Sequence, residues 1–140
     1  MTIWFKPPSL AQINQSHENT AVSQMGIEFM EVTDEGLTAR MPVDARTRQP
    51  AGLLHGGANV LLAETLASCA SWQTIDRTAT SAVGLEINAN HVRGVREGWV
   101  TGTVTALHLG RSTQLWQVQI VDAQQRLVSI ARATISLIAL

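Results

Sequence analysis

The sequence predicts an α+β fold in which one curved antiparallel sheet wraps around a single long helix. Two segments with strand-like alternation come first, at 26–32 and 37–43, and one long apolar segment, 53–72, follows them. Every later segment is rich in strand-forming residues. A helix that is apolar on all sides has to be buried on all sides, and one sheet curling around it does this, with a partner subunit covering what remains. Because no linker-like stretch interrupts the 140 residues, we expect a single domain, 1–140.

The order of the elements follows from local signals. Ser9 and Gln12 have the spacing of a capping box, which predicts a short helix near the N-terminus. The turn "TDEG" joins the first two strands into a hairpin, and a loop with Pro50 and Gly52 leads into the long helix. The expected strands after that helix are 81–93, 99–109, 114–122 and 127–140. Short turns separate them, so we expect each strand to pair with the next one, antiparallel.

Composition excludes several classes of protein. A formal net charge of −1 argues against a nucleic-acid surface or a basic membrane patch. A lone cysteine, Cys69, excludes an intrachain disulfide and fits a reducing compartment. The first residues lack the pattern of a secretory signal, and the apolar run at 127–140 is too short to span a bilayer. We therefore expect a cytoplasmic protein that binds neither nucleic acid nor membrane.

One carboxylate, Glu64, stands in the middle of the apolar helix. No other charged residue occurs between His55 and Asp76, so no ion pair within the helix can neutralise it. Burying an unpaired carboxylate costs several kcal/mol, roughly. Glu64 can have a purely structural explanation, in which it pairs with a distant arginine or faces solvent at one exposed edge of the helix. The alternative is that the residue has a chemical role. Ser68, one turn later on the same face, makes a small polar spot with it.

The residues at the start of the helix favour the chemical role. His55 is followed by Gly56 and Gly57, where the first N–H groups of a helix have no intrahelical acceptor. Such N–H groups can bind a developing negative oxygen. Gln49, in the loop before them, can donate through its amide. A water activator, an oxyanion site and a polarising amide together predict hydrolysis of an activated carbonyl.

The stretch "QPAGLLHGGANVLLAETLAS" resembles the signature of hotdog-fold acyl-CoA thioesterases that carry their acidic residue on the central helix. The resemblance covers nearly the whole chain, including "MPVDARTRQP", "GLEINANHVR" and "LHLGR". It is strongest with family members that act on 1,4-dihydroxy-2-naphthoyl-CoA in menaquinone biosynthesis, followed by those that clear misacylated aryl carriers in enterobactin synthesis. It implies a hotdog fold, an acyl-CoA or carrier-protein thioester as substrate, and no cofactor or metal. It also implies a homodimer that assembles into a homotetramer, with active sites at the dimer interface.

The resemblance also implies roles for particular residues. Glu64 is the expected catalytic carboxylate, either a nucleophile or a general base for water. The Gly56 N–H and the Gln49 amide are expected to polarise the thioester carbonyl, while His55 and Ser68 position the water or the carbonyl. The further substrate contacts that it implies are His91 in the acyl pocket and, for CoA, Val83, Gly84, Leu85, Arg93, His108, Gly110, Arg111 and Ser112.

Ala51 departs from the family pattern, because close relatives usually carry an aromatic residue after the Gln-Pro pair. If residue 51 lines the acyl pocket, the pocket is looser here. We therefore expect a preference for aromatic acyl-CoA with tolerance of medium-chain fatty acyl-CoA. Cys69, among apolar residues of the helix and without a basic neighbour in sequence, is expected to be core filler.

Two other functions stay open at this point. A hotdog hydratase or dehydratase also pairs a histidine with an acid, but proline-rich turns would be expected after the histidine, where this chain has "HGGAN". A non-catalytic acyl-CoA-binding hotdog domain would not need Glu64, Gln49 and His55 together. The chain has no GxSxG motif of a serine hydrolase, and its four histidines lack short zinc-ligand spacing.

Overall fold

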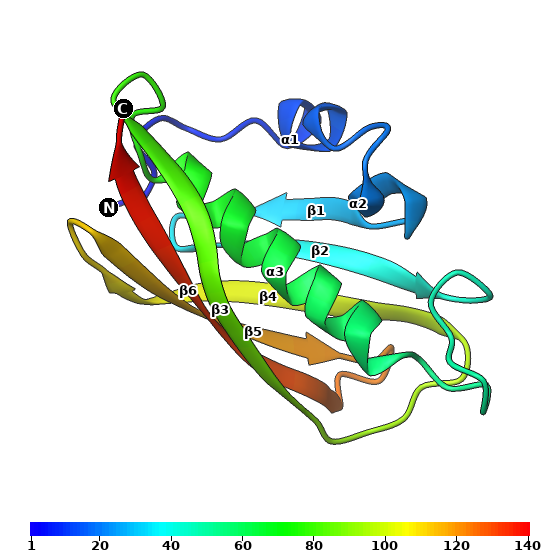
Figure 1. The fold of residues 1–140 in the computed structure, drawn as a ribbon. Coiled ribbons are helices and arrows are strands. Elements are labelled where there is room, and N and C mark those ends of the chain that lie inside the picture. The colour runs from blue at the N-terminus through cyan, green and yellow to red at the C-terminus, as the bar shows by residue number, and fades with distance from the viewer.

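A computed structural model describes all residues from 1 to 140 (Figure 1). The chain forms three helices and six strands. In order these are α1 (Leu10–Ser16), α2 (Ala21–Gln24), β1 (Glu28–Val32), β2 (Gly36–Val43), α3 (Gly56–Gln73), β3 (Thr80–His91), β4 (Gly98–Leu109), β5 (Thr113–Val121) and β6 (Leu127–Ala139).

The six strands form one antiparallel sheet in the order β1-β2-β4-β5-β6-β3, and α3 crosses one face of it (Figure 1). The alternating strands turn one set of side chains toward the helix; Trp116, Val118 and Ile120 of β5 are all fully buried. They belong to a core of 26 buried apolar residues between sheet and helix. The predicted α+β class, with a curved sheet around one helix, is confirmed.

One strand pairing differs from the prediction. The hairpins β4–β5 and β5–β6 form as expected, but β3 pairs with β6 and not with β4. Residues 92–97 carry the chain from the end of β3 across the sheet, so "REG" closes a crossing connection and not a hairpin turn. As a result β3 lies at an edge, and exposed Val83 and Leu85 stand on a long strand whose second side has no partner.

Two short helices precede the sheet. The predicted helix near Ser9 is present as α1, with the Ser9 hydroxyl accepting a hydrogen bond from the Gln12 N–H. Helix α2 was not predicted, although Thr20 and Ser23 form a full capping box at its start.

Helix α3 is buried on most sides but not on all. Its open face carries Val60, Leu61, Glu64, Ser68 and Trp72, which recur at the spacing of one helix face and are partly or fully exposed. Within one protomer the sheet therefore reaches only part of the way round the helix, and the covering of the remaining face by a partner subunit stays a prediction. No helix is both long enough and apolar enough to cross a bilayer.

Candidate active site

The start of α3 is a backbone site framed by two histidines. The His55 Nδ1 atom caps the helix by accepting from the Gly57 N–H at 2.8 Å, so the neutral ring carries its proton on Nε2. A Cβ on Gly56 would lie 2.9 Å from Cδ2 and Nε2 of His91, so only glycine lets this ring lie so close to the first turn. The Gly56 N–H, as the first of the helix, has no intrahelical acceptor. It can donate to a ligand oxygen.

The loop before the helix fixes the direction of the Gln49 amide. The Gln49 N–H donates to the Leu53 carbonyl at 2.8 Å, and the Gly52 N–H donates back to the Gln49 carbonyl at 2.9 Å. The side-chain Oε1 accepts from the Ala51 N–H. Because the amide oxygen is used within the loop, the Nε2 group is the free end and can act as a donor.

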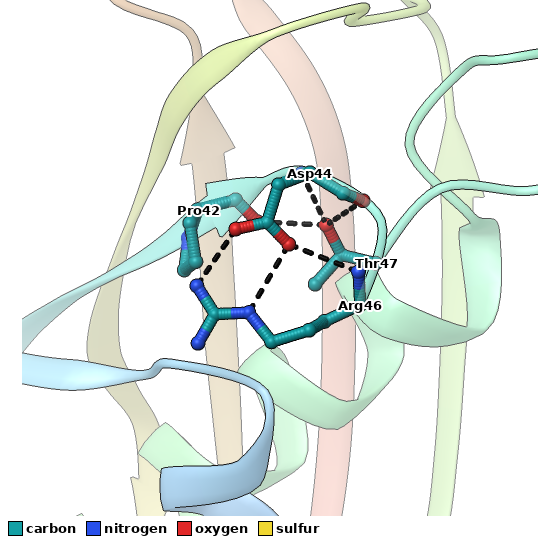
Figure 2. A network of polar contacts seen from close by, with 4 residues as sticks. All are labelled: Pro42, Asp44, Arg46 and Thr47. Atoms are coloured by element: carbon teal, nitrogen blue, oxygen red, sulfur yellow. Dashed lines mark hydrogen bonds and ion pairs between the residues drawn. The ribbon is translucent and has the colours of Figure 1, made fainter.

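A buried hydroxyl ties this loop to the end of β2 (Figure 2). Thr47 is 1% exposed, and its hydroxyl donates to the Pro42 carbonyl at 2.7 Å and accepts from the Asp44 N–H at 3.1 Å. The Thr47 carbonyl accepts from the His55 N–H at 2.8 Å. Thr47 thus connects the end of β2 to the N-cap of α3. These two elements precede and follow Gln49 in the sequence. Nothing in the sequence pattern had singled out Thr47.

An ion pair closes the same turn on its outer side. Arg46 Nη2 lies 2.7 Å from Asp44 Oδ2, and its Nε donates to Oδ1 at 3.1 Å (Figure 2). Hydrogen bonds from the Arg46 side chain and backbone lower the pKa of Asp44 to about 2. The carboxylate therefore remains charged throughout the neutral range.

Thr47→Val should lower the free energy of unfolding by about 1–3 kcal/mol, because it leaves the Pro42 carbonyl and the Asp44 N–H without their partner. Urea unfolding measures the change. The matched control is Thr105→Val, at an exposed position of β4 where the hydroxyl makes no hydrogen bond, and it should change stability by less than about 0.5 kcal/mol. Equal losses in the two variants would contradict this role for Thr47.

Glu64 stands on the open face of α3 without any partner. Its carboxylate makes no hydrogen bond and no ion pair within the protomer, so no distant arginine neutralises it, and the side chain is exposed instead. A Cβ on Gly84 of β3 would lie 3.0 Å from Glu64 Oε1, so the absence of a side chain there lets the carboxylate approach the strand. Glu64 borders a cavity of about 560 Å³ on the side of α1 and α2.

Ser68 and Cys69 line this same cavity one turn further along α3. Ser68 is half-buried and its hydroxyl makes no hydrogen bond with the protein. Burial raises the pKa of the Cys69 thiol to about 12, so it remains protonated at neutral pH and is a poor nucleophile. This agrees with the prediction that Cys69 fills the core.

The predicted site residues fall into two groups that are separate within one protomer. Gly56 and Glu64 are eight residues apart on α3, which is about 12 Å along the helix axis. The first group surrounds the start of α3; it contains Gln49, Ala51, His55, Gly56, His91 and Arg93. The second group is associated with the middle of α3 and the start of β3; it contains Glu64, Ser68, Val83, Gly84 and Leu85.

The residues expected to contact CoA divide in the same way. The turn with His108, Gly110, Arg111 and Ser112 joins β4 to β5, and Thr113 and Val83 both pair with Ser136 of β6. This turn therefore lies level with the start of β3, two strands away. Arg93 follows the other end of β3, roughly 30 Å from Val83 for an extended chain. A single protomer does not bring Arg93 and Arg111 together.

Two residues that the sequence did not indicate hold His91. The Ser129 hydroxyl lies 3.0 Å from His91 Nδ1, and the Asn59 Nδ2 atom lies 3.4 Å from it. Asn59 is 3% exposed and its Oδ1 atom has no hydrogen-bond partner. Only the tertiary pairing of β3 with β6 brings Ser129 to this place, so no local signal could have identified it.

Comparisons with known proteins show which family the chain resembles. Residues 51–129 match the model of the thioesterase superfamily. The chain is 45% identical over 136 residues to the 1,4-dihydroxy-2-naphthoyl-CoA hydrolase of Escherichia coli, covering 97% of this chain and 99% of that protein.

Solved structures show the same similarity. A Q49A variant of the thioesterase PA1618 from Pseudomonas aeruginosa superposes with a TM-score of 0.98 at 46% identity, covering 99% of this chain and all of that one. The thioesterase HI1161 from Haemophilus influenzae superposes with a TM-score of 0.95 at 43% identity, covering 99% of this chain and 96% of that one.

Proposed function

Because the chain belongs to the thioesterase superfamily and is a thioester hydrolase, we propose that it cleaves acyl-CoA with Glu64 as its catalytic carboxylate. The observation that carries this proposal is the environment of Glu64. The carboxylate lies beside a cavity of about 560 Å³ and has no ion pair and no hydrogen bond that would give it a structural role. An unpartnered carboxylate is free to activate water or to attack a thioester carbonyl itself.

The carbonyl oxygen binds at the start of α3. The Gly56 N–H and the Gln49 Nε2 group are donors without partners in the protein, and both lie at the helix end where the backbone dipole favours negative charge. As the thioester becomes tetrahedral, its oxygen gains charge and these hydrogen bonds strengthen. When the tetrahedral species collapses, the carbon–sulfur bond breaks and its electron pair goes to the CoA sulfur. The products are the free acid and CoA. His55 and Ser68 orient the water or the carbonyl.

Since the two groups of residues are about 12 Å apart in one protomer, we propose that each active site is built from two protomers. Strand β3 supports this proposal. It is a long, unpaired edge, and exposed Val83 and Leu85 lie at its start, which favours addition of another strand. An antiparallel pair of two β3 strands sets the early half of one opposite the late half of the other. Such a pair brings the start of one β3, where Gly84 lies beside Glu64, toward the end of the other, where His91 lies beside Gly56.

Light scattering tests the assembly. We expect a mass of at least two protomers at micromolar concentration, and a homotetramer as the complete form, because a monomer leaves the β3 edge and the open face of α3 in water. A Leu85→Lys variant should shift the mass toward the monomer and lose activity with it. A stable wild-type monomer would contradict the shared site.

For the substrate, we propose an aromatic acyl-CoA, of which 1,4-dihydroxy-2-naphthoyl-CoA in menaquinone biosynthesis is the leading candidate. The name of the Escherichia coli relative supports this choice. Ala51 is exposed on the loop that Gln49 closes and offers a ring no flat surface to pack against, so we propose that medium-chain fatty acyl-CoA is tolerated as well. Thiol release from a panel of aryl-CoA, fatty acyl-CoA and carrier-protein thioesters tests the proposal. Hydrolysis of none of them would contradict it.

A further inference from the structure

The cavity beside Glu64 extends well past the reacting carboxylate, toward the C-terminal end of α3. Glu64 and Gln73 both line it, and the helix carries these residues about 13 Å apart along its axis. Arg77 lines it four residues further on. If the thioester carbonyl lies at Glu64, as proposed above, this cavity gives the acyl group a path toward Gln73 and Arg77.

This far end of the cavity is polar. Only four of the 11 residues that line the whole cavity are hydrophobic, and beyond Trp72 the lining side chains are Gln73 and Arg77. Ser16 and His17 contribute from the end of α1. His17 already has partners within the protein. Its Nδ1 atom lies 2.8 Å from the Ile13 carbonyl oxygen, and its ring stacks on Phe29 with the two ring centres 5.2 Å apart. A hydrocarbon chain that reached this end would displace water from these polar groups and offer them no hydrogen bond in return.

Arg77 is fixed at one end and free at the other. Its Nε donates to the Trp72 carbonyl at 3.2 Å, and its guanidinium carbon lies 5.8 Å from the centre of the Trp72 ring. No carboxylate is within ion-pair distance of it. The Nη groups form an unused planar fork, which matches a carboxylate in geometry and charge.

A second hollow meets the cavity here. A groove of about 340 Å³ under the N-terminal segment is also lined by Ser16, Trp72, Gln73 and Arg77, so the two share one end. Asp76, an acid in that groove, accepts from the N–H and the hydroxyl of Thr78 at 3.0 and 2.7 Å. It does not pair with Arg77. Ser16 and Arg77 are exposed at this shared end, so a charged terminus can stay hydrated there.

We propose that, in addition to aromatic acyl-CoA, the enzyme accepts elongated acyl groups that end in a carboxylate remote from the thioester. Arg77 binds that carboxylate through its fork, and the Gln73 amide donates a further hydrogen bond. Glu64, at the other end, is far enough away for its like charge to be largely screened. This proposal rests on the position of the thioester at Glu64.

The test compares two substrates of equal chain length. Decanoyl-CoA ends in a methyl group, and the mono-CoA thioester of sebacic acid ends in a carboxylate. We expect the wild type to hydrolyse the second with at least the same kcat/KM as the first. Arg77→Gln should lower kcat/KM for the sebacoyl thioester about 10-fold, and for decanoyl-CoA by less than about 2-fold. The control is Arg132→Gln, at an exposed site on β6 between buried Ala131 and Ala133, which should change neither value.

Equal losses on both substrates in Arg77→Gln, or a wild type that prefers decanoyl-CoA tenfold or more, would overturn the proposal. In either case, hydrolysis of benzoyl-CoA that disappears in Glu64→Gln would leave the proposed function intact. Absence of any Glu64-dependent hydrolysis would overturn both.

Discussion

Glu64→Gln should lower kcat by about 10²–10⁴-fold, the range for loss of a positioned base, and by more if Glu64 is the nucleophile. The amide keeps the shape of the side chain but has neither the charge nor the basicity of the carboxylate. Because Glu64 makes no hydrogen bond and no ion pair in the protomer, the fold should not depend on it. Thermal unfolding should therefore be unchanged. Thiol release under saturating benzoyl-CoA measures kcat.

Two further variants sharpen this result. Glu64→Asp shortens the side chain by one methylene. It should also have a strongly reduced kcat, because the helix fixes the distance from the carboxylate to the carbonyl. Glu35→Gln, at an exposed turn position where the carboxylate makes no contact, should keep wild-type kcat. Near-normal turnover of Glu64→Gln would end the proposed mechanism.

Gln49→Ala should lower kcat by roughly 10²–10³-fold with a smaller effect on KM, because it removes a donor that is used most in the transition state. The geometry of the loop is the reason. The Ala51 N–H occupies the amide oxygen, which leaves the Nε2 group to point away from the loop as a donor. Full saturation curves with one aryl-CoA give both constants.

The control for Gln49 is Gln119→Ala, an exposed position of β5. It should leave kcat and KM unchanged. If KM rises in Gln49→Ala while kcat stays at the wild-type value, Gln49 binds the ground state and the transition state equally well. Its role as an oxyanion donor is then wrong.

Much of the fold could be predicted because each element has a local signal. Alternation identified the strands, and the apolar segment identified α3. Which strands pair is a different matter. The place of β3 beside β6 depends on residues 92–97 crossing the sheet, and a short turn-like stretch does not reveal that crossing.

The open face of α3 was hidden for a related reason. A helix that is apolar all round does not indicate which side its own sheet covers and which side a second chain covers. The sequence therefore left open whether Glu64 is buried or faces solvent, and in the protomer it is exposed.

The candidate site was predictable in its residue types and less so in its arrangement. The run from Gln49 to Gly56 was identified as a donor cluster, and the structure shows the loop that orients it. Ser129 supports that cluster across 38 residues of sequence, so no motif could identify it, and Thr47 supports it through nearby contacts that no known motif marks. Arg77 follows α3 directly, but only the cavity shows what it faces.

The central claim is that each active site combines Glu64 of one protomer with Gln49 and Gly56 of another. Mixing two inactive variants tests it directly. The Glu64→Gln and Gln49→Ala proteins are unfolded together in equal amounts and refolded. In each mixed dimer, one of the two sites carries both substitutions and the other carries none. With random pairing, about a quarter of all sites are intact. We therefore expect kcat per protomer to return to about a quarter of the wild-type value, far above either variant refolded alone. Activity that stays at the level of the separate variants, although mixed dimers have formed, would contradict a site shared between protomers.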